Sequence, residues 1–376
     1  MKPNEESKLI KNNKSKNQKN KKFFCSFLKN TKSNIIKWSI LIILIALIIF
    51  IIISIIILYQ IKKEPMKILL EQIQQNKEYF SLPANESTKY SDLLLDEKKI
   101  CSTNKKFAIL RRTNCEPCGL FSYYIVHLGC IINYLKHGYI PILEVASFSN
   151  IFTGNNKPRD NPWEEFFNQP CGYTLNEVVK MKDVKIFKCE CVCDMPDEKT
   201  IYSNTIMLNY HHKIQEKYMS IKNNIYKEVE KIWQNLFGNS TNVLGIFIRG
   251  TDYISIEPSG HSRQPSTKRL INDVIKMNKK NKYDFIFLGT EDNKIRNLFI
   301  KIFGKNLKYL IPKDKIFYNY DTGNYLTYNK NVFGNMNFSK IYLLSVIILS
   351  KCIDIISSRT SGAAGVFIIS NGFRNK

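Results

Sequence analysis

The segment Val243–Tyr253 reads VLGIFIRGTDY: an apolar run that ends abruptly in polar residues. The run VLGIFI predicts a strand that is buried on both faces, as in a parallel sheet covered by helices. A polar run, Arg249-Gly250-Thr251-Asp252, follows at once. Ligands of open α/β sheets bind beyond the carboxyl ends of the strands. We therefore expect these side chains to face a ligand rather than the core.

Two later strands end in the same way. The run YDFIFLG is followed by Thr290-Glu291-Asp292, and IDIIS is followed by Ser358-Arg359-Thr360-Ser361-Gly362. Arginine binds diphosphates in a bidentate manner, and a Ser/Thr/Gly-rich helix start offers free N–H groups to phosphate. The carboxylates of Glu291 and Asp292, which follow the middle strand, suit hydrogen bonds with the ribose or the base of a nucleotide. Together the clusters predict a nucleoside-diphosphate site. Taken singly, Thr290 and Ser361 also fit ordinary helix N-caps.

Strand and helix patterns alternate from residue 106 in two series, separated by a long helical stretch that we expect to break near Asn223-Asn224. Such alternation predicts parallel sheets with covered faces. We expect an α/β fold of two doubly wound, Rossmann-like halves, residues 106–235 and 236–376, that face a cleft. The predicted strands are KFAILRR, YIPILEV, NVLGIFIRG, YDFIFLGT, KYLIP and IDIISS.

The amino-terminal region predicts a membrane anchor. Residues 1–37 form a Lys/Asn-rich tail of net charge +9, and residues 38–59 are 22 residues without a charge. About 20 apolar residues cross a bilayer, and the preceding lysines place the amino terminus in the cytoplasm. A cleaved signal peptide would have a shorter apolar region. Residues 60–105 then form a stem, unless the helical pattern within it packs on the domain.

The formal charge of +24 fits nucleic acid, anionic membranes or phosphorylated ligands as partners. No basic helix has the interleaved pattern of a nucleic-acid reader, so we expect no nucleic-acid partner. Nine of the ten cysteines follow the predicted span, including Cys115 and Cys118 and the cluster CECVC at 189–193. Zinc would use C-x-x-C as half a site, but the second cluster has the wrong spacing for the other half. In an oxidising compartment disulfides are favoured, in a pairing that the spacing does not reveal, and no metal is expected.

The stretches GIFIRGTDY, EPSGHSRQPS, FIFLGTED and SSRTSGAAG resemble the fucosyltransferase superfamily, which includes the α-1,2-, α-1,6- and protein O-fucosyltransferases. GLFSYYIVHLGCIINYLKHGYIPILEV and NPWEEFFNQP resemble the amino-terminal half of related capsule-type glycosyltransferases. The resemblance covers residues 106–372. It implies a GT-B fold, a GDP-sugar donor such as GDP-fucose, inversion at the anomeric carbon, and no metal or other cofactor.

The same resemblance implies roles for individual residues of the carboxyl-terminal, nucleotide-sugar half. Arg249 would hold the β-phosphate of GDP, and Asp252 would brace Arg249 or the sugar. Glu291 and Asp292 would meet the guanosine. The expected donor-binding set is Arg249, Gly250, Thr251, Tyr253, Thr290, Glu291, Asp292, Ser358, Thr360, Ser361 and Gly362.

Inversion needs a base that takes the proton of the acceptor hydroxyl. The candidates are Asp252, His261 and, from the acceptor half, Glu164; His261 also fits a simple loop histidine. Trp163 and Phe121 are candidate acceptor-binding aromatics, although Trp163 also fits an anchor of its loop in the core. Phe247 replaces the family's usual histidine two residues before Arg249, and the arginine is single. A non-catalytic glycan- or nucleotide-binding surface protein therefore remains the alternative.

The predicted topology adds a constraint on location. Nucleotide sugars are found across a membrane only in compartments that import them. A cytoplasmic amino terminus, an anchor and a stem therefore predict a type II protein whose catalytic domain is lumenal, in the Golgi, and meets a glycan or glycoprotein acceptor there.

Overall fold

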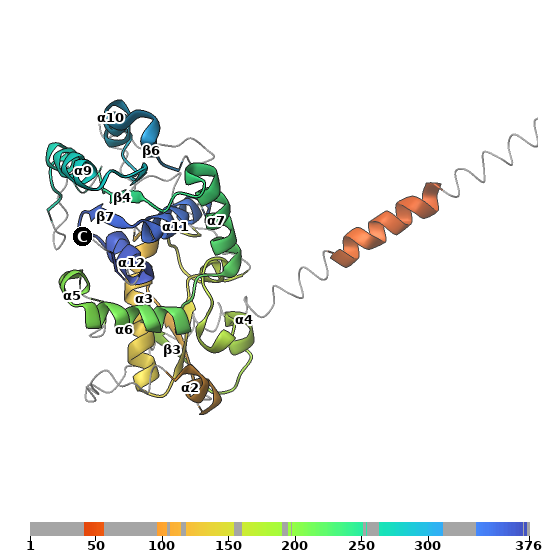
Figure 1. The fold of residues 1–376 in the computed structure, drawn as a ribbon. Coiled ribbons are helices and arrows are strands. Elements are labelled where there is room, and N and C mark those ends of the chain that lie inside the picture. The colour runs from red at the N-terminus through yellow and green to blue at the C-terminus, as the bar shows by residue number, and fades with distance from the viewer. Residues whose placement is uncertain are drawn as a thin grey trace, which may run out of the picture. The chain divides into compact units, whose positions relative to one another are not determined.

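The computed structural model describes residues 41–55, 96–103, 106–113, 118–153, 160–189, 195–196, 198–250, 253, 263–310, 336–370 and 372–373. The chain divides into two compact units, Met1–Glu64 and Pro65–Lys376. The fold of the second unit positions the candidate site, and Figure 1 labels its elements.

In the first unit, residues 41–55 form a helix whose large apolar side chains are exposed to solvent (Figure 1). Within the described ranges, no helix has both the length and the apolar character that a membrane crossing needs. The ends of the predicted span, residues 38–40 and 56–59, lie outside those ranges, as does the tail.

The first sheet of the second unit has three parallel strands in the order β2-β1-β3. They are β1 (Phe107–Arg111), β2 (Ile140–Glu144) and β3 (Val184–Lys188). β1 and β2 are entirely buried, as their apolar runs predict. We did not predict β3, because its sequence VKIFK alternates charged and apolar residues and follows an irregular segment.

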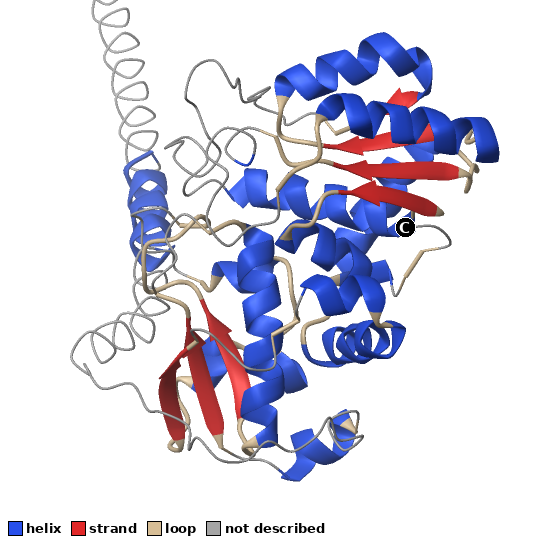
Figure 2. Cartoon of the chain, turned by 90° about the vertical axis from the view of Figure 1, so that its left-hand side faces the viewer, coloured by secondary structure: helices blue, strands red, loops and turns tan. Residues whose placement is uncertain are grey.

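The second sheet has four parallel strands in the order β6-β5-β4-β7. They are β4 (Val243–Phe247), β5 (Phe285–Gly289), β6 (Leu307–Lys308) and β7 (Asp354–Ser357). β4 is the central strand: it pairs with β5 on one side and with β7 on the other. The α/β class and the parallel sheets are confirmed, and Figure 2 shows the two sheets as separate sets of strands with helices between them.

The long central stretch breaks near Asn223 as expected: α6 ends at Tyr218 and α7 begins at Asn223. The helical pattern predicted within the stem lies outside the described residues. The α-helices are α2 (Glu97–Thr103), α3 (Leu120–Lys136), α4 (Leu175–Val178), α5 (Glu198–Ser203), α6 (Thr205–Tyr218), α7 (Asn223–Phe237), α9 (Thr267–Asn281), α10 (Asn293–Phe303), α11 (Met336–Lys351) and α12 (Ser361–Ser370). Short 3-10 turns are η2 (Pro162–Glu165), η3 (Pro170–Gly172) and η4 (Gly304–Asn306).

One hydrophobic cluster extends through both halves, since it contains residues of α3 and α6 as well as of β4, α11 and α12. Helix α12, which follows the last strand of the second sheet, packs on α3, α5 and α6 of the first half (Figure 1). The His212 ring on α6 also bonds the Ile368 carbonyl of α12 at 2.7 Å. The two halves are therefore joined by a helix that belongs to the core of both.

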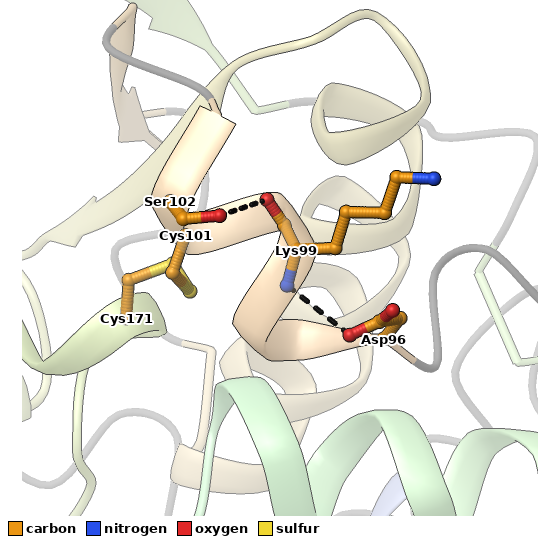
Figure 3. The surroundings of a disulfide bond; sticks show 5 residues. All are labelled: Asp96, Lys99, Cys101, Ser102 and Cys171. Carbon is orange, nitrogen blue, oxygen red and sulfur yellow. Dashed lines mark hydrogen bonds between the residues drawn. A yellow bond between two sulfur atoms is a disulfide. The ribbon is translucent and has the colours of Figure 1, made fainter.

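Two disulfides join pairs of described residues in the first half, and Cys118 is disulfide-bonded as well. Cys130 on α3 is bonded to Cys189 at the end of β3, and Cys101 on α2 is bonded to Cys171 (Figure 3). Helix α2 lies within the predicted stem, yet the Cys101 bond and the buried Ile100 make it part of the folded domain. Its start is capped by the Asp96 carboxylate, which accepts from the Lys99 N–H at 3.1 Å. The stem prediction is thus wrong for residues 97–103.

Candidate functional site

The three predicted strand ends lie at one edge of the second sheet. β5, β4 and β7 are parallel neighbours, so their carboxyl ends coincide. The Gly250 N–H after β4 donates to Glu291 Oε1 after β5 at 2.8 Å. The Ser358 N–H after β7 donates to the Phe247 carbonyl of β4 at 3.2 Å. The strand order reverses at β4, and such switch points are where doubly wound sheets bind ligands.

Arg249 lies at the centre of this edge and is 9% exposed. Its Nε is 3.6 Å from Glu291 Oε1, and its Cζ lies 4.8 Å from the centre of the Tyr253 ring. The carboxylate and the ring fix the direction of the guanidinium, and little water screens it. An oriented, poorly solvated guanidinium is a strong partner for a phosphate group.

The end of β7 supplies a buried hydroxyl and a helix start. Ser358 is 2% exposed, and no residue in the described ranges is hydrogen-bonded to its Oγ. Thr360 caps α12, because its Oγ1 accepts from the Ala363 N–H at 3.1 Å. Ser361 is the first helical residue, so the predicted cap at Ser361 is wrong by one position. The ten-residue α12 therefore directs its positive dipole end to the edge that holds Arg249.

Two glycines allow close packing here. A side chain on Gly250 would overlap the Asp292 carboxylate of the neighbouring strand end. A side chain on Gly362, in the first turn of α12, would overlap the Tyr342 hydroxyl of α11. Glycine at both positions lets the three strand ends and α11 approach one another.

The polar residues after β5 also hold the local structure. Asp292 is 3% exposed, and its Oδ1 caps α10 by accepting from the N–H groups of Lys294 and Ile295 at 2.8 and 3.0 Å. Thr290 Oγ1 accepts from the Asp292 N–H at 3.2 Å. Asp292 is thus the N-cap that we predicted at Thr290, and one oxygen of its carboxylate is committed to the helix. Glu291 braces Arg249, a role that we had expected of Asp252.

Among the candidate bases, Asp252 and His261 lie outside the described residues, as does Thr251. Glu164 lies in η2 of the first half, and its Oε1 accepts from Leu175 N at 2.8 Å, from Gln169 Nε2 at 3.0 Å and from Asn161 Nδ2 at 3.3 Å. These bonds hold the loop to α4. Glu164 therefore has a structural task that sequence alone does not reveal.

The two aromatic candidates for the acceptor site are core residues. Trp163 is 0% exposed; its ring stacks on Phe167 at 4.4 Å and meets the His127 ring edge-on at 4.7 Å. Phe121 is 1% exposed and meets the Tyr342 ring edge-on at 5.3 Å. Neither ring has a free face for a sugar, and we withdraw both assignments. A single sequence does not tell an aromatic that anchors a loop from one that faces a ligand.

The carboxyl edge of the first sheet holds a second buried arginine, which we had not singled out. Arg111, at the end of β1, donates from Nε to Glu144 Oε2 at 2.8 Å and from Nη2 to the Ser147 hydroxyl. Glu144, at the end of β2, also accepts from the N–H groups of Ala146 and Ser147, both at 2.6 Å. The Glu144 carboxylate therefore accepts four hydrogen bonds within this cluster. The signal was present in the sequence, since Arg111 and Glu144 end two predicted strands.

No protein-family model and no curated protein sequence matches the chain. Solved structures to which it is similar include fucosyltransferases. For the fucosyltransferase NodZ from Bradyrhizobium, the identity is 13%, with 70% of this chain and 92% of that chain covered and a TM-score of 0.41. For a variant of Arabidopsis thaliana FUT1 in complex with GDP, the identity is 8%, with 77% of this chain and 74% of that chain covered and a TM-score of 0.41. For POFUT1 in complex with GDP, the identity is 9%, with 74% of this chain and 76% of that chain covered and a TM-score of 0.35. At these values the likeness carries no activity over to this chain.

Proposed function

We propose that this chain is a glycosyltransferase of the fucosyltransferase type, which transfers fucose from GDP-fucose to a glycan or glycoprotein with inversion and without a metal. The observation that carries the proposal is the edge of the second sheet. There the oriented guanidinium of Arg249, the start of α12 and the hydroxyl of Ser358, which no described residue hydrogen-bonds, meet at the switch point of the sheet. These are the groups that a diphosphate needs.

The same groups account for the chemistry. The acceptor hydroxyl attacks the anomeric carbon, the bond from that carbon to the β-phosphate oxygen breaks, and GDP leaves with an additional negative charge. Arg249 and the N-terminus of α12 stabilise that charge as it develops. A base takes the proton of the acceptor hydroxyl. Asp252 and His261, from the segment that follows Arg249, are our candidates for the base.

We place the enzyme in the Golgi membrane as a single-pass type II protein with a lumenal catalytic domain. The helix over residues 41–55 supports the membrane part, because it exposes apolar side chains on all sides, and such a helix is suited to lipid. The disulfides Cys101–Cys171 and Cys130–Cys189 support the oxidising side of a membrane for the second unit.

The alternative is a non-catalytic protein that binds a nucleotide or glycan with the same fold. One oxygen of Glu164 is engaged in holding its loop to α4, and Phe247 stands where the family motif commonly has histidine. This alternative predicts binding without turnover.

The test uses the full chain in detergent and a panel of GDP- and UDP-sugars. Binding is measured by calorimetry, and transfer is measured by nucleotide release and by mass spectrometry of glycan acceptors. We expect GDP and GDP-fucose to bind and GDP to be released when an acceptor is present. Binding of GDP without release under every acceptor would favour the non-catalytic alternative. If neither GDP nor any GDP-sugar binds, the proposal is wrong.

A further inference from the structure

Tyr342 of α11 lies at the junction of the two halves, beside the proposed site. Its ring stacks on Phe247, the last residue of β4, with 6.2 Å between the centroids and a 20° angle between the planes. The same ring meets Phe121 of α3 edge-on at 5.3 Å. One contact comes from the second sheet and the other from the first half. The ring is therefore held on two sides by residues that are themselves buried.

The hydroxyl of Tyr342 is directed at the start of α12, where a side chain on Gly362 would overlap it. The charges of Arg249 and Glu291 and the Tyr253 hydroxyl all act on this phenol. Burial raises its pKa well above the ordinary value, and Arg249 opposes that rise to a smaller extent. The phenol thus stays protonated at neutral pH and keeps a proton to donate.

This hydroxyl has no hydrogen-bond partner among the residues that the structure describes, although packing fixes its ring. The hydroxyl of a tyrosine whose ring is packed in this way usually has a hydrogen-bond partner. An anion at the start of α12 would lie within reach of it.

We infer that the Tyr342 hydroxyl donates a hydrogen bond to the diphosphate of the bound nucleotide, as a binding group contributed by α11. This inference rests on the proposed function. It adds a residue of helix α11 to the strand-end residues of the proposed site.

The test compares the full-length wild type with Tyr342→Phe, which keeps the ring and removes only the hydroxyl. The matched control is Tyr226→Phe on α7, whose side chain is 39% exposed. GDP and guanosine are titrated by calorimetry, and inorganic pyrophosphate is used as a competitor of GDP.

We expect Tyr342→Phe to weaken GDP and pyrophosphate binding about tenfold, because a hydrogen bond to a charged group is lost. Guanosine affinity, the unfolding midpoint and the Tyr226→Phe variant should match wild type. If GDP binds the variant as tightly as wild type, or if guanosine affinity falls equally, the Tyr342 inference is overturned and the proposed function stands. If wild type binds no GDP, both fall together.

Discussion

The carboxyl edges of the two sheets each place a buried arginine beside a glutamate, and the two edges differ in how their polar groups are hydrogen-bonded. In the first sheet, Glu144 is 0% exposed and lies 2.8 Å from Arg111, with two backbone N–H groups and the Ser147 hydroxyl as further donors. In the second sheet, the arginine and carboxylate are 3.6 Å apart, and the Ser358 hydroxyl is unpartnered in the described part of the chain. This difference, and the Ser358 hydroxyl above all, is the basis on which we propose a ligand site at the second edge rather than at the first.

The largest loss of stability should follow from removing the Glu144 carboxylate, which pairs with Arg111. Glu144→Ala leaves the Arg111 charge buried without its partner, which typically costs about 3–5 kcal/mol of unfolding free energy. Urea unfolding measures the loss. The matched change in the second sheet, Glu291→Ala, also removes the carboxylate beside a buried arginine, but that pair is longer, at 3.6 Å against 2.8 Å, so the loss of stability should be smaller than for Glu144→Ala. Equal losses for the two variants would contradict the contrast between the edges.

Acid should destabilise the first half through His127 on α3. Burial, with a smaller contribution from Arg112, lowers the pKa of His127 to about 3 from 6.5. The unfolded chain binds a proton below pH 6.5 and the folded chain does not, so stability falls as the pH drops. The expected loss between pH 7 and pH 5 is about 2 kcal/mol. Urea unfolding at both pH values should show that His127→Phe removes this part of the loss. A variant with the same pH slope as wild type would refute the prediction.

The two serines sharpen the contrast further. Ser147 Oγ accepts from Arg111 and donates to Glu144, so Ser147→Ala should cost about 1–3 kcal/mol of stability and leave GDP affinity unchanged. Ser358→Ala removes a hydroxyl that has no partner in the described part of the protein, so stability should be unchanged while GDP affinity falls about fivefold. Unfolding curves and GDP titrations of both variants give the comparison. It fails if Ser358→Ala is the less stable of the two.

The smallest expected change in GDP affinity comes from substitutions at the starts of α12 and α3. Gly362→Ala would press a methyl group on the Tyr342 hydroxyl, whereas Gly119→Ala, at the N-cap of α3, meets nothing within 4 Å. We expect GDP binding to weaken severalfold in the first variant, because the first turn of α12 must shift, and to be unchanged in the second. A GDP titration that shows the reverse order would argue against a phosphate at α12.

The sequence predicted the framework of the site well, because apolar strands that end in polar residues have a distinctive pattern. β4, β5 and β7 and the helix start after Thr360 lie where that pattern places them. The sequence did not predict which residue of the site has which structural role. Asp292 and Glu291 are adjacent, and only the three-dimensional path of the chain decides which one caps α10 and which one braces Arg249.

The errors concern residues whose environment is formed by distant parts of the chain. Trp163 and Phe121 are buried by residues from other segments, such as Phe167 and Tyr342, which no local pattern reveals. The strand β3 was missed because charged residues alternate along it, and the position of α2 is fixed by a disulfide to Cys171. The inference about Tyr342 likewise depends on contacts with distant residues, Phe121 and Phe247, because this tyrosine lies within a helix rather than at a strand end.

The most direct test of the central claim is calorimetric titration of GDP into wild type and Arg249→Ala. The control is Arg269→Ala on α9, whose side chain is 77% exposed. Loss of a bidentate, charge-assisted contact should weaken GDP binding about a hundredfold in Arg249→Ala, while Arg269→Ala matches wild type. Because Arg249→Ala leaves Glu291 without its buried partner, its unfolding midpoint should fall, and the titrations are made at a temperature at which all three proteins are folded. Wild-type affinity for GDP in Arg249→Ala would contradict the account.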